Sequence, residues 1–454
     1  MHSYQHNHFF AVLSTIIHRK WMHKHFMGLR NMIKRLVVEQ SNLYAIQCNT
    51  NEPFNLTTKE LEQFMGTAVY MSLFGLPGTR MLWNKATRVS QVADTMALNR
   101  WEFIKKCLHF NNNEVRQGEN VDLLHKIRPL VTHLTSKLQT IPMGSKLAVD
   151  EQMVPFKGRN RLKQYLLAKP KKWGYKILVL AGSDGVPHNF EIYTGRVVQP
   201  PELPDVGASC NVVLRLAQPI PKHQKHKLFF DKWFTSVPLI LTLAQQGIHC
   251  AGTVRSSRLP GVSMMCDAEL KRTGRGSFDQ KTAMVGETTV HAVKWYDNRS
   301  VSLLSDYIGA HQVTDVDRWD GKQKKVIRVP CPAVVREYNK NMGGVDLLDS
   351  VIALYRTKIS SKKWYHRLMF HFIDMTTVTA WLLYKRDCSS TGMSKEEQIR
   401  LYTRGPATPI PVSDVRLDAT AHWMVMDEKK GRCKVPGCKG TPKANNCFLR
   451  FHTE

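Results

Sequence analysis

The chain has 454 residues, of which 43% are hydrophobic, so it is long enough for two or three domains and too apolar to be a disordered chain. Its 65 Lys and Arg residues exceed its 37 Asp and Glu residues, and the net charge of +28 favours a polyanionic partner, with nucleic acid ahead of a membrane surface. No run reaches the ~18 apolar residues that a membrane span needs, and the apolar run at 9–17 lacks the flanks of a signal peptide, so we expect an intracellular protein.

The N-terminal third of the chain has helical periodicity. Residues 1–31 are rich in His and aromatic side chains, and we interpret them as a poorly ordered leader. Thr57 and Glu60 have the spacing of a capping box ahead of an apolar helical face. Two further apolar faces of the same period begin at Trp101 and Ile127. Since nothing in this part has a catalytic pattern, we expect a helical platform.

The pattern changes to strand alternation at Lys146. Ser236 is a plausible N-cap, with Pro238 in the first turn of the helix that follows it. The predicted order is strand–strand–strand–helix–strand–helix–strand, and the second and third strands form a hairpin. The strands are expected at 147–150, 177–180, 190–192, 228–230 and 250–254, and the helices at 210–216 and 239–243.

The remainder of the chain has three parts. Residues 256–325 are polar, Gly-rich and basic, with short strands such as 288–295, and they have the character of an insertion. Helical patterning returns after Pro332 and includes a strongly apolar helix at 368–383 that we assign to the core. Residues 403–414 form a Pro-rich linker.

Aspartates stand at the ends of predicted elements. Asp150 ends the first strand, Asp231 ends the fourth, and Asp346 follows a Gly-Gly break at a helix start, with Asp349 on the same helix face. Two-metal cleavage of a phosphodiester needs carboxylates that hold two ions ~3.5–4 Å apart. A single aspartate is more often a cap or a surface charge, and the spacing leaves open whether Asp346 or Asp349 is the third ligand. Glu151 should face the opposite side of its strand, so we do not count it as a ligand.

Basic residues cluster near these aspartates in sequence. Each cluster is either a solvated loop or a phosphate contact, and the net charge favours contact with DNA. The candidate DNA-binding residues are Lys157, Arg159, Lys169, Lys171, Lys172, Lys362 and Lys363.

Several long segments make the chain resemble the piggyBac transposase family, specifically the transposable element-derived proteins. The resemblance runs from about Met32 to the C-terminus. The matching segments are VDEQMVPFKGR (149–159), KPKKWGYK (169–176), FEIYTGR (190–196), HKLFFDKWFTSVP (226–238), GTVRSSRLPG (252–261), PCPAVVREYNKNMGGVDLLD (330–349) and ALYRTKISSKKWYHR (353–367).

The resemblance implies an α/β fold with an RNase H-like catalytic domain, a mixed five-stranded sheet with helices. It implies a catalytic triad of Asp150, Asp231 and Asp346, with Asp349 accessory, that binds two Mg²⁺ or Mn²⁺ ions. The implied activity is cut-and-paste DNA transposition through hairpin ends, with insertion into double-stranded DNA at TTAA sites. A homodimer and a nuclear location are further expectations.

The expected domains follow from the pattern and the resemblance together. The catalytic and helical domains are each discontinuous, because the insertion interrupts one and the catalytic domain interrupts the other. The expected parts are a leader (1–31), a helical dimerisation and DNA-binding domain (32–145 and 349–402), the catalytic domain (146–255 and 326–348), the insertion (256–325), a linker (403–430) and a degenerate Cys-rich tail (431–454).

The tail departs from the family pattern. Seven of the ten cysteines stand singly, which suits a reducing compartment. The other three lie in the tail with one histidine, where the family has a domain that binds two zinc ions and reads the transposon ends. The residues that remain are Cys433, Cys438, Cys447 and His452. They could hold one Zn²⁺ tetrahedrally, or the tail could bind little or no zinc.

Three functional hypotheses remain open from the sequence. The intact aspartate trio favours an active transposase. The reduced tail favours a domesticated or decaying DNA-binding protein without cleavage activity, as does the lack of the long acidic N-terminal region usual in the family. A metal-dependent phosphatase or RNase also fits three aspartates, but the insertion and the helical platform make it less favoured.

Overall fold

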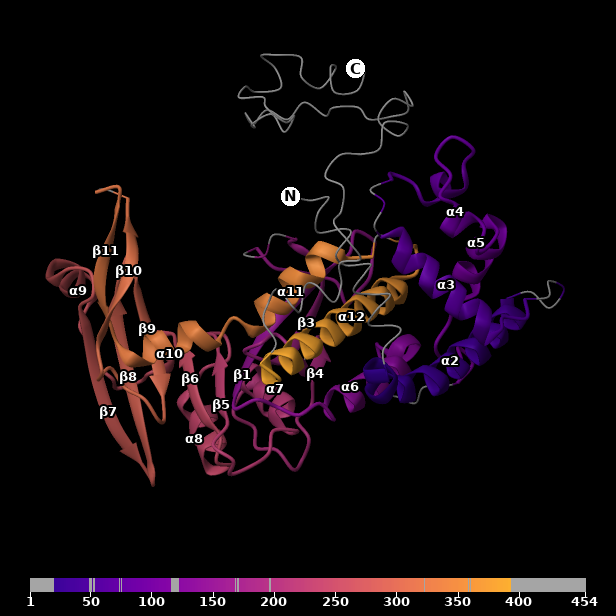
Figure 1. Ribbon diagram of the computed structural model, residues 1–454. Coiled ribbons are helices and arrows are strands. Elements are labelled where there is room, and N and C mark those ends of the chain that lie inside the picture. The colour runs from indigo at the N-terminus through magenta and orange to yellow at the C-terminus, as the bar shows by residue number, and fades with distance from the viewer. Residues whose placement is uncertain are drawn as a thin grey trace, which may run out of the picture. The chain divides into compact units, whose positions relative to one another are not determined.

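The structure is a computed structural model that describes residues 20–392 apart from 49–50, 52–53, 73, 75, 116–121, 168, 170, 196, 322, 358 and 360 (Figure 1). The expected linker and Cys-rich tail lie outside the described residues, as do Cys433, Cys438, Cys447 and His452. Helical structure begins at Lys20, inside the segment expected to be a leader. None of the described helices is long and apolar enough to cross a membrane.

The first part of the chain is helical, as its periodicity predicts. Buried apolar residues of these helices form one core, which includes Phe64, Trp101 and Ile127. The helices are α2 (Lys20–Cys48), α3 (Thr58–Met71), α4 (Ser90–Ala93), α5 (Leu98–Cys107) and α6 (Arg128–Leu138), with 3₁₀ turns η1 (Thr79–Trp83) and η2 (His125–Ile127).

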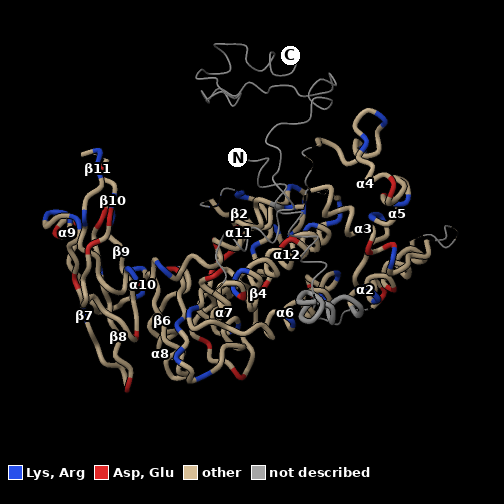
Figure 2. Tube along the Cα trace, viewed as in Figure 1, with Lys and Arg blue, Asp and Glu red and all other residues tan. Residues whose placement is uncertain are grey.

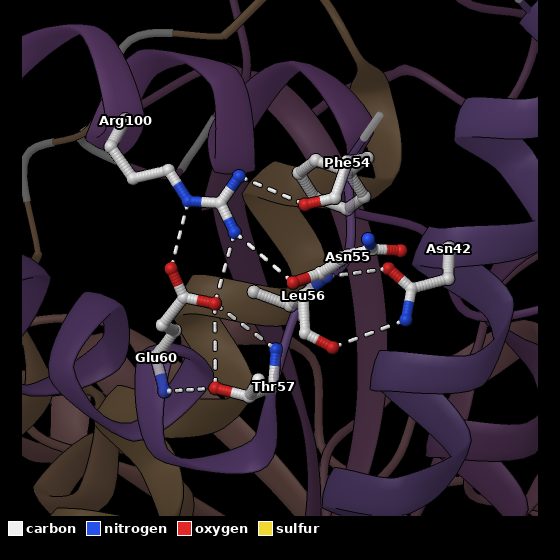
Figure 3. Close-up of polar contacts among 7 residues, drawn as sticks. All are labelled: Asn42, Phe54, Asn55, Leu56, Thr57, Glu60 and Arg100. Atoms are coloured by element: carbon white, nitrogen blue, oxygen red, sulfur yellow. Dashed lines mark hydrogen bonds and ion pairs between the residues drawn. The ribbon is translucent and has the colours of Figure 1, made fainter. Parts of the chain in front are cut away.

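One polar network ties three of these helices together (Figure 3). Thr57 caps α3 and forms the predicted capping box with Glu60. Arg100 of α5 binds both carboxylate oxygens of Glu60, at 2.8 and 2.9 Å, and donates to the Phe54 carbonyl. The hydrogen bonds from Arg100 lower the pKa of Glu60. Asn42 of α2 exchanges two hydrogen bonds with the backbone of Leu56, so the loop before α3 is held on both sides.

The strands that follow form one large mixed sheet. The strands are β1 (Lys146–Pro155), β2 (Gln164–Tyr165), β3 (Trp173–Gly182), β4 (Pro187–Ile192), β5 (Lys227–Phe230), β6 (His249–Thr253), β7 (Phe278–Val285), β8 (Thr288–Tyr296) and β9 (Ser300–Ser305). A separate two-stranded sheet pairs β10 (Thr314–Asp320) with β11 (Lys325–Cys331). The helices between strands are α7 (Ala208–Ala217), α8 (Val237–Gln245) and α9 (Asp267–Thr273), with the turn η3 (Ser256–Arg258).

The sheet is larger than the sequence predicts. We expected five strands, and β4, β3, β1, β5 and β6 do lie side by side in that order. The prediction of five is wrong because the short β2 also pairs with β3, and because β9 pairs with β6 and is followed by β8 and β7, which makes nine strands in all. These three strands come from the segment interpreted as an insertion. Its polar composition reflects an outer strand, β7, whose last five residues are exposed.

Helices cover both faces of the central strands (Figure 1). On one face, Val149 and Leu178 share a core with buried residues of α7 and α8. On the other face, Val179 packs with residues of α11 (Gly344–Tyr355) and α12 (Trp364–Ser390). The same face continues at Ala148, which shares a core with residues of α10 (Ala333–Asn341). The alternation of successive strand residues between the two cores is the expected strand period.

The start of α11 approaches the end of β3 without room for a side chain. A Cβ atom added at Gly344 would overlap the backbone carbonyl of Gly182. Val345, Leu348 and Ile352 of α11 are buried in the adjoining core. A glycine is therefore required where α11 begins, and this contact sets the height of the helix above the sheet.

We predict that Gly344→Ala displaces α11 and destabilises the fold by about 1–3 kcal/mol, because the new methyl group overlaps backbone atoms. Gly343→Ala is the matched control, since a Cβ atom at Gly343 meets nothing within 4 Å. Thermal unfolding of both variants tests this. Equal midpoints for the two variants would contradict the close approach.

Candidate active site at the β1–β5 edge

Strand register aligns two of the predicted aspartates. In the parallel pairing of β1 with β5, Val149 lies opposite Phe230, so Asp150 and Asp231 come next on neighbouring strands. Neighbouring strands are about 4.8 Å apart. In the pairing of β5 with β6, Phe230 lies opposite Gly252, which puts Thr253 next in the same row. The row therefore carries two carboxylates and one hydroxyl.

The prediction that Asp150 ends its strand is wrong. β1 continues to Pro155, because Asp150 stays paired with Val179 of β3 and the residues beyond it are paired in turn. Asp231, by contrast, directly follows the last residue of β5, as predicted. The local sequence misled at Asp150 because the polar residues after it belong to a strand whose partner, β3, is strongly apolar.

A tight turn holds Asp231. The Oδ1 atom of Asp231 accepts from the backbone N–H of Trp233 at 2.7 Å, and the Asp231 carbonyl accepts from the Thr235 hydroxyl at 2.9 Å. A Cβ atom at Gly252 would overlap Thr235 and Phe230, so the turn rests directly on β6. The helix that follows begins at the predicted N-cap, Ser236, whose side chain accepts from the Leu239 N–H. The sequence from Asp231 to Ser236 thus fixes the carboxylate in place.

Asp150 is a desolvated carboxylate in an acidic neighbourhood. Burial raises its pKa to about 7, with a further contribution from the charge of Glu151, while the charge of Lys169 acts in the opposite direction. Its Oδ1 atom accepts from the Glu151 backbone N–H at 2.8 Å. The raised pKa means that a nearby cation would stabilise the ionised form of Asp150.

α11 contributes the other two aspartates, and they differ in their surroundings. The Asp346 side chain is 73% exposed, and its Oδ1 atom lies 4.0 Å from the Nζ atom of Lys169. Asp349 is half-buried, and burial raises its pKa. Its Oδ1 atom accepts from Gln152 of β1 at 3.4 Å and lies 3.5 Å from Arg356. Asp346 is therefore the freer side chain, and Asp349 is the anchored one.

Tyr338 of α10 lies near three of the predicted aspartates. Burial raises the pKa of its hydroxyl, and the charges of Asp231, Asp150 and Asp346 raise it further. A hydrogen bond with Thr253, the third member of the strand row, has the opposite effect. Tyr338 is therefore within electrostatic reach of all three carboxylates.

Two lysines lie among these carboxylates. The Nζ atom of Lys169 donates to the Glu151 carbonyl at 3.0 Å and lies 3.9 Å from a Glu151 carboxylate oxygen. The buried Lys176 of β3 has its Nζ atom 4.0 Å from Glu151 and 4.0 Å from the centre of the Trp233 ring. Both lysines balance the acidic charge, and sequence reasoning assigned Lys169 only to DNA and missed Lys176.

The predicted basic residues differ in their surroundings. Lys157, Arg159, Lys171, Lys172 and Lys362 are exposed, and Lys and Arg residues are spread over many elements (Figure 2). Lys363 differs from them, because its ammonium group donates to the Lys106 carbonyl and lies 4.2 Å from the centre of the Tyr44 ring. Burial lowers the pKa of Lys363 to about 8. Its charge is already engaged within the helical platform.

The carboxylate groups of this site are of the type that binds divalent cations, but they are not arranged as a complete set of ligands around one position. Carboxylate oxygens are the ligands that Mg²⁺ prefers, and Asp150 and Asp231 stand side by side. Within the described ranges, however, no three His, Cys, Asp or Glu side chains are already arranged to hold an ion. Asp346 would have to turn from Lys169 towards the strand row to complete such a site.

A second buried carboxylate fastens the segment between α11 and α12. Asp374 of α12 accepts from the Thr357 hydroxyl at 2.6 Å and from the Thr357 backbone N–H at 3.1 Å. Burial raises the pKa of Asp374 to about 6, against the effect of these hydrogen bonds. The contact holds the chain one residue after Arg356, which faces Asp349. Asp374 therefore stabilises the end of the aspartate-bearing helix.

We predict a pH-dependent stability that Asp374→Asn removes. Because the folded-state pKa exceeds the unfolded value, the folded state binds the proton more tightly, so this stability is present at low pH and is lost as pH rises through about 6. The unfolding free energy of the wild type relative to Asp374→Asn should fall by about 2–3 kcal/mol between pH 4 and pH 7. Urea unfolding at each pH measures this, with Asp387→Asn on the same helix as the control. A pH-independent difference would contradict it.

Comparison with known proteins agrees with this fold. A family model described as Transposase IS4 matches residues 24–381. Human PiggyBac transposable element-derived protein 3 is 29% identical over 428 residues, which cover 93% of this chain and 67% of that protein. Human PiggyBac transposable element-derived protein 2 is 29% identical over 418 residues, covering 88% of this chain and 69% of that protein.

A solved structure is similar as well. It is a piggyBac transposase synaptic complex with hairpin DNA, with a TM-score of 0.64 and 23% identity, covering 82% of this chain and 77% of that one. The mixed sheet flanked by helices is therefore a transposase-type α/β fold. The chain belongs to the transposase IS4 family and, within it, to the piggyBac proteins, as its motifs predict.

Proposed function

We propose that this protein is a piggyBac-type DNA transposase in which Asp150, Asp231 and Asp346, with Asp349, hold two Mg²⁺ or Mn²⁺ ions. The observation that supports this most is the strand register, which puts Asp150 and Asp231 next to each other on neighbouring parallel strands. Two carboxylates at such a spacing repel one another unless protons or cations neutralise them. The raised pKa of Asp150 is consistent with a site that takes up positive charge.

The strand order supports an RNase H-like catalytic domain. Counted along the chain, the five central strands lie in the order third, second, first, fourth, fifth. Among the first three strands each adjacent pair is antiparallel, and the last two strands run parallel to the first. This arrangement brings the end of the fourth strand beside the middle of the first, where the two aspartates lie. Residues 146–255 and 326–348 remain our boundaries for this domain.

Each acidic residue has a distinct part in the proposed reaction. When bound, the divalent ions would polarise the scissile phosphate and generate the attacking oxygen nucleophile. Asp150 and Asp231 would hold the ions from the sheet, because one is fixed in a paired strand and the other by its turn. Asp346 would close the site from α11, since its exposed side chain is free to turn. Lys169, now between the carboxylates, would be displaced towards a DNA phosphate.

The proposed substrate is double-stranded DNA, cut at transposon ends and joined at TTAA sites. The net charge of +28 supports DNA as the partner, and one similar solved protein is described in complex with hairpin DNA. The exposed residues Lys157, Arg159, Lys171 and Lys172 surround the end of β1 and the start of β3 in sequence, so they are our candidate phosphate contacts. A homodimer acting in the nucleus completes the proposal.

We predict that Asp231→Asn abolishes Mg²⁺-dependent cleavage of the inverted-repeat DNA that flanks the coding region, while DNA affinity changes little. The substitution removes a metal-binding charge but keeps the hydrogen-bond acceptor used by Trp233. Asp315→Asn, at an exposed position on β10, is the control and should cleave like the wild type. Gel assays of cleavage and binding measure both effects. Normal cleavage by Asp231→Asn would refute the assignment.

A DNA-binding protein without cleavage activity is the second candidate. The similar human proteins are described as derived from a transposable element, a description that fits an active or a domesticated protein equally. In this case the wild type and Asp231→Asn would both bind the DNA and neither would cut it. Binding would weaken steeply with salt, because phosphate contacts release counterions.

A further inference from the structure

Beneath Asp349 lies a chain of polar side chains from three elements. His371 of α12 contacts Gln152 of β1, with 2.8 Å between the His371 Nε2 atom and the Gln152 Oε1 atom. The Gln152 Nε2 atom in turn donates to the Oδ1 atom of Asp349 on α11 at 3.4 Å. Gln152 and His371 are both fully buried. These two hydrogen bonds therefore connect α12 to α11 through Gln152 of β1.

The hydrogen bonds have one consistent direction. Burial lowers the pKa of His371 well below its usual value, so the ring is neutral and carries a single N–H. That N–H must be at Nε2, since the Gln152 carbonyl oxygen can only accept. The amide N–H₂ of Gln152 is then directed at Asp349, where it meets an acceptor. His371 thus orients Gln152 so that its donor faces the carboxylate.

Asp349 is held from a second direction by Arg356. Arg356 is the residue that follows α11, and its guanidinium group lies 3.5 Å from the same Oδ1 atom. Asp346 is three residues before Asp349 and therefore on the same helix face. Since the only ion pair of Asp346 among the described residues is the 4.0 Å contact with Lys169, its direction depends on how α11 is rotated. Fixing Asp349 fixes that rotation.

The polar side chains of Gln152, His371 and Arg356 lower the stability of the fold relative to apolar side chains, because some of their buried atoms have no hydrogen-bond partner among the described residues. The His371 Nδ1 atom and the Arg356 Nε atom are buried without a hydrogen-bond partner among the described residues. Each unsatisfied buried polar atom costs about 1–3 kcal/mol. Apolar side chains at 152 and 371 would fill the same volume without this cost. Residues that hydrogen-bond to metal ligands and thereby fix the direction of those ligands are retained despite such a loss of stability.

We propose that Gln152 and His371 are positioning residues that orient Asp349 and thereby aim the α11 carboxylates at the Asp150–Asp231 row. The proposal rests on the proposed function, because it assigns the pair to the divalent-ion site of that function. Neither residue contacts the strand aspartates in any hydrogen bond of the described structure. Their effect would be transmitted through Asp349 and the α11 backbone.

Two measurements on the full-length protein test the proposal. Gln152→Met keeps the length of the side chain and removes both hydrogen bonds, and His371→Leu removes the donor. We expect each to speed amide hydrogen exchange within residues 344–355 and to weaken Mn²⁺ binding, followed by titration, by about 10–100-fold. His371→Gln keeps an N–H donor near the Nε2 position, so it should restore both properties towards the wild type.

The control is Thr379→Val, which alters a fully buried residue of α12 whose hydroxyl donates to the Met375 carbonyl. It should change neither property, which separates positioning from general loss of packing around α12. Wild-type exchange within 344–355 in Gln152→Met, or exchange that rises equally throughout β1 and α12, would overturn the proposal. Mn²⁺ binding that is unchanged in Asp231→Asn would instead overturn the proposed function. The hydrogen-exchange result would still show whether Gln152 and His371 hold α11 in place.

Discussion

The parallel pairing of β1 with β5 is the constraint on which the site depends. It joins two segments about 80 residues apart, and its register puts Asp150 and Asp231 in one row. The other elements of the site are positioned around this row. The Asp231 turn rests on Gly252, Tyr338 of α10 lies within electrostatic reach of the carboxylates, and Gly344 lets α11 lie close to β3. A shift of one residue in register would turn Asp150 to the opposite face of the sheet.

The site combines rigid and adjustable parts. Asp150 and Asp231 are fixed by backbone pairing and by a hydrogen-bonded turn, whereas Asp346 is exposed and ion-paired only loosely with Lys169. The positive charges of Lys169 and Lys176 balance carboxylates that otherwise repel one another. Such an arrangement offsets the repulsion between closely spaced carboxylates. It also explains why a lysine predicted to touch DNA lies among acidic groups.

Much of the local structure could be predicted from the sequence, and the reasons are local. The capping box at Thr57, the N-cap at Ser236 and the position of Asp231 after β5 each depend on a few adjacent residues. The extent of the sheet could not be predicted, because β7–β9 join it through pairing with β6, which no local pattern reveals. The end of β1 was misplaced for the same reason. The Gln152–His371 pair was missed because its partners are 219 residues apart in the chain.

The central claim is that Asp150 and Asp231 form one cation site. The most direct test is anomalous diffraction from crystals of the full-length protein grown with Mn²⁺. The account predicts an anomalous peak bridging the carboxylates of Asp150 and Asp231, with Asp346 turned towards it. A structure in which these two side chains bind no ion, while Mn²⁺ occupies other positions, would contradict the account.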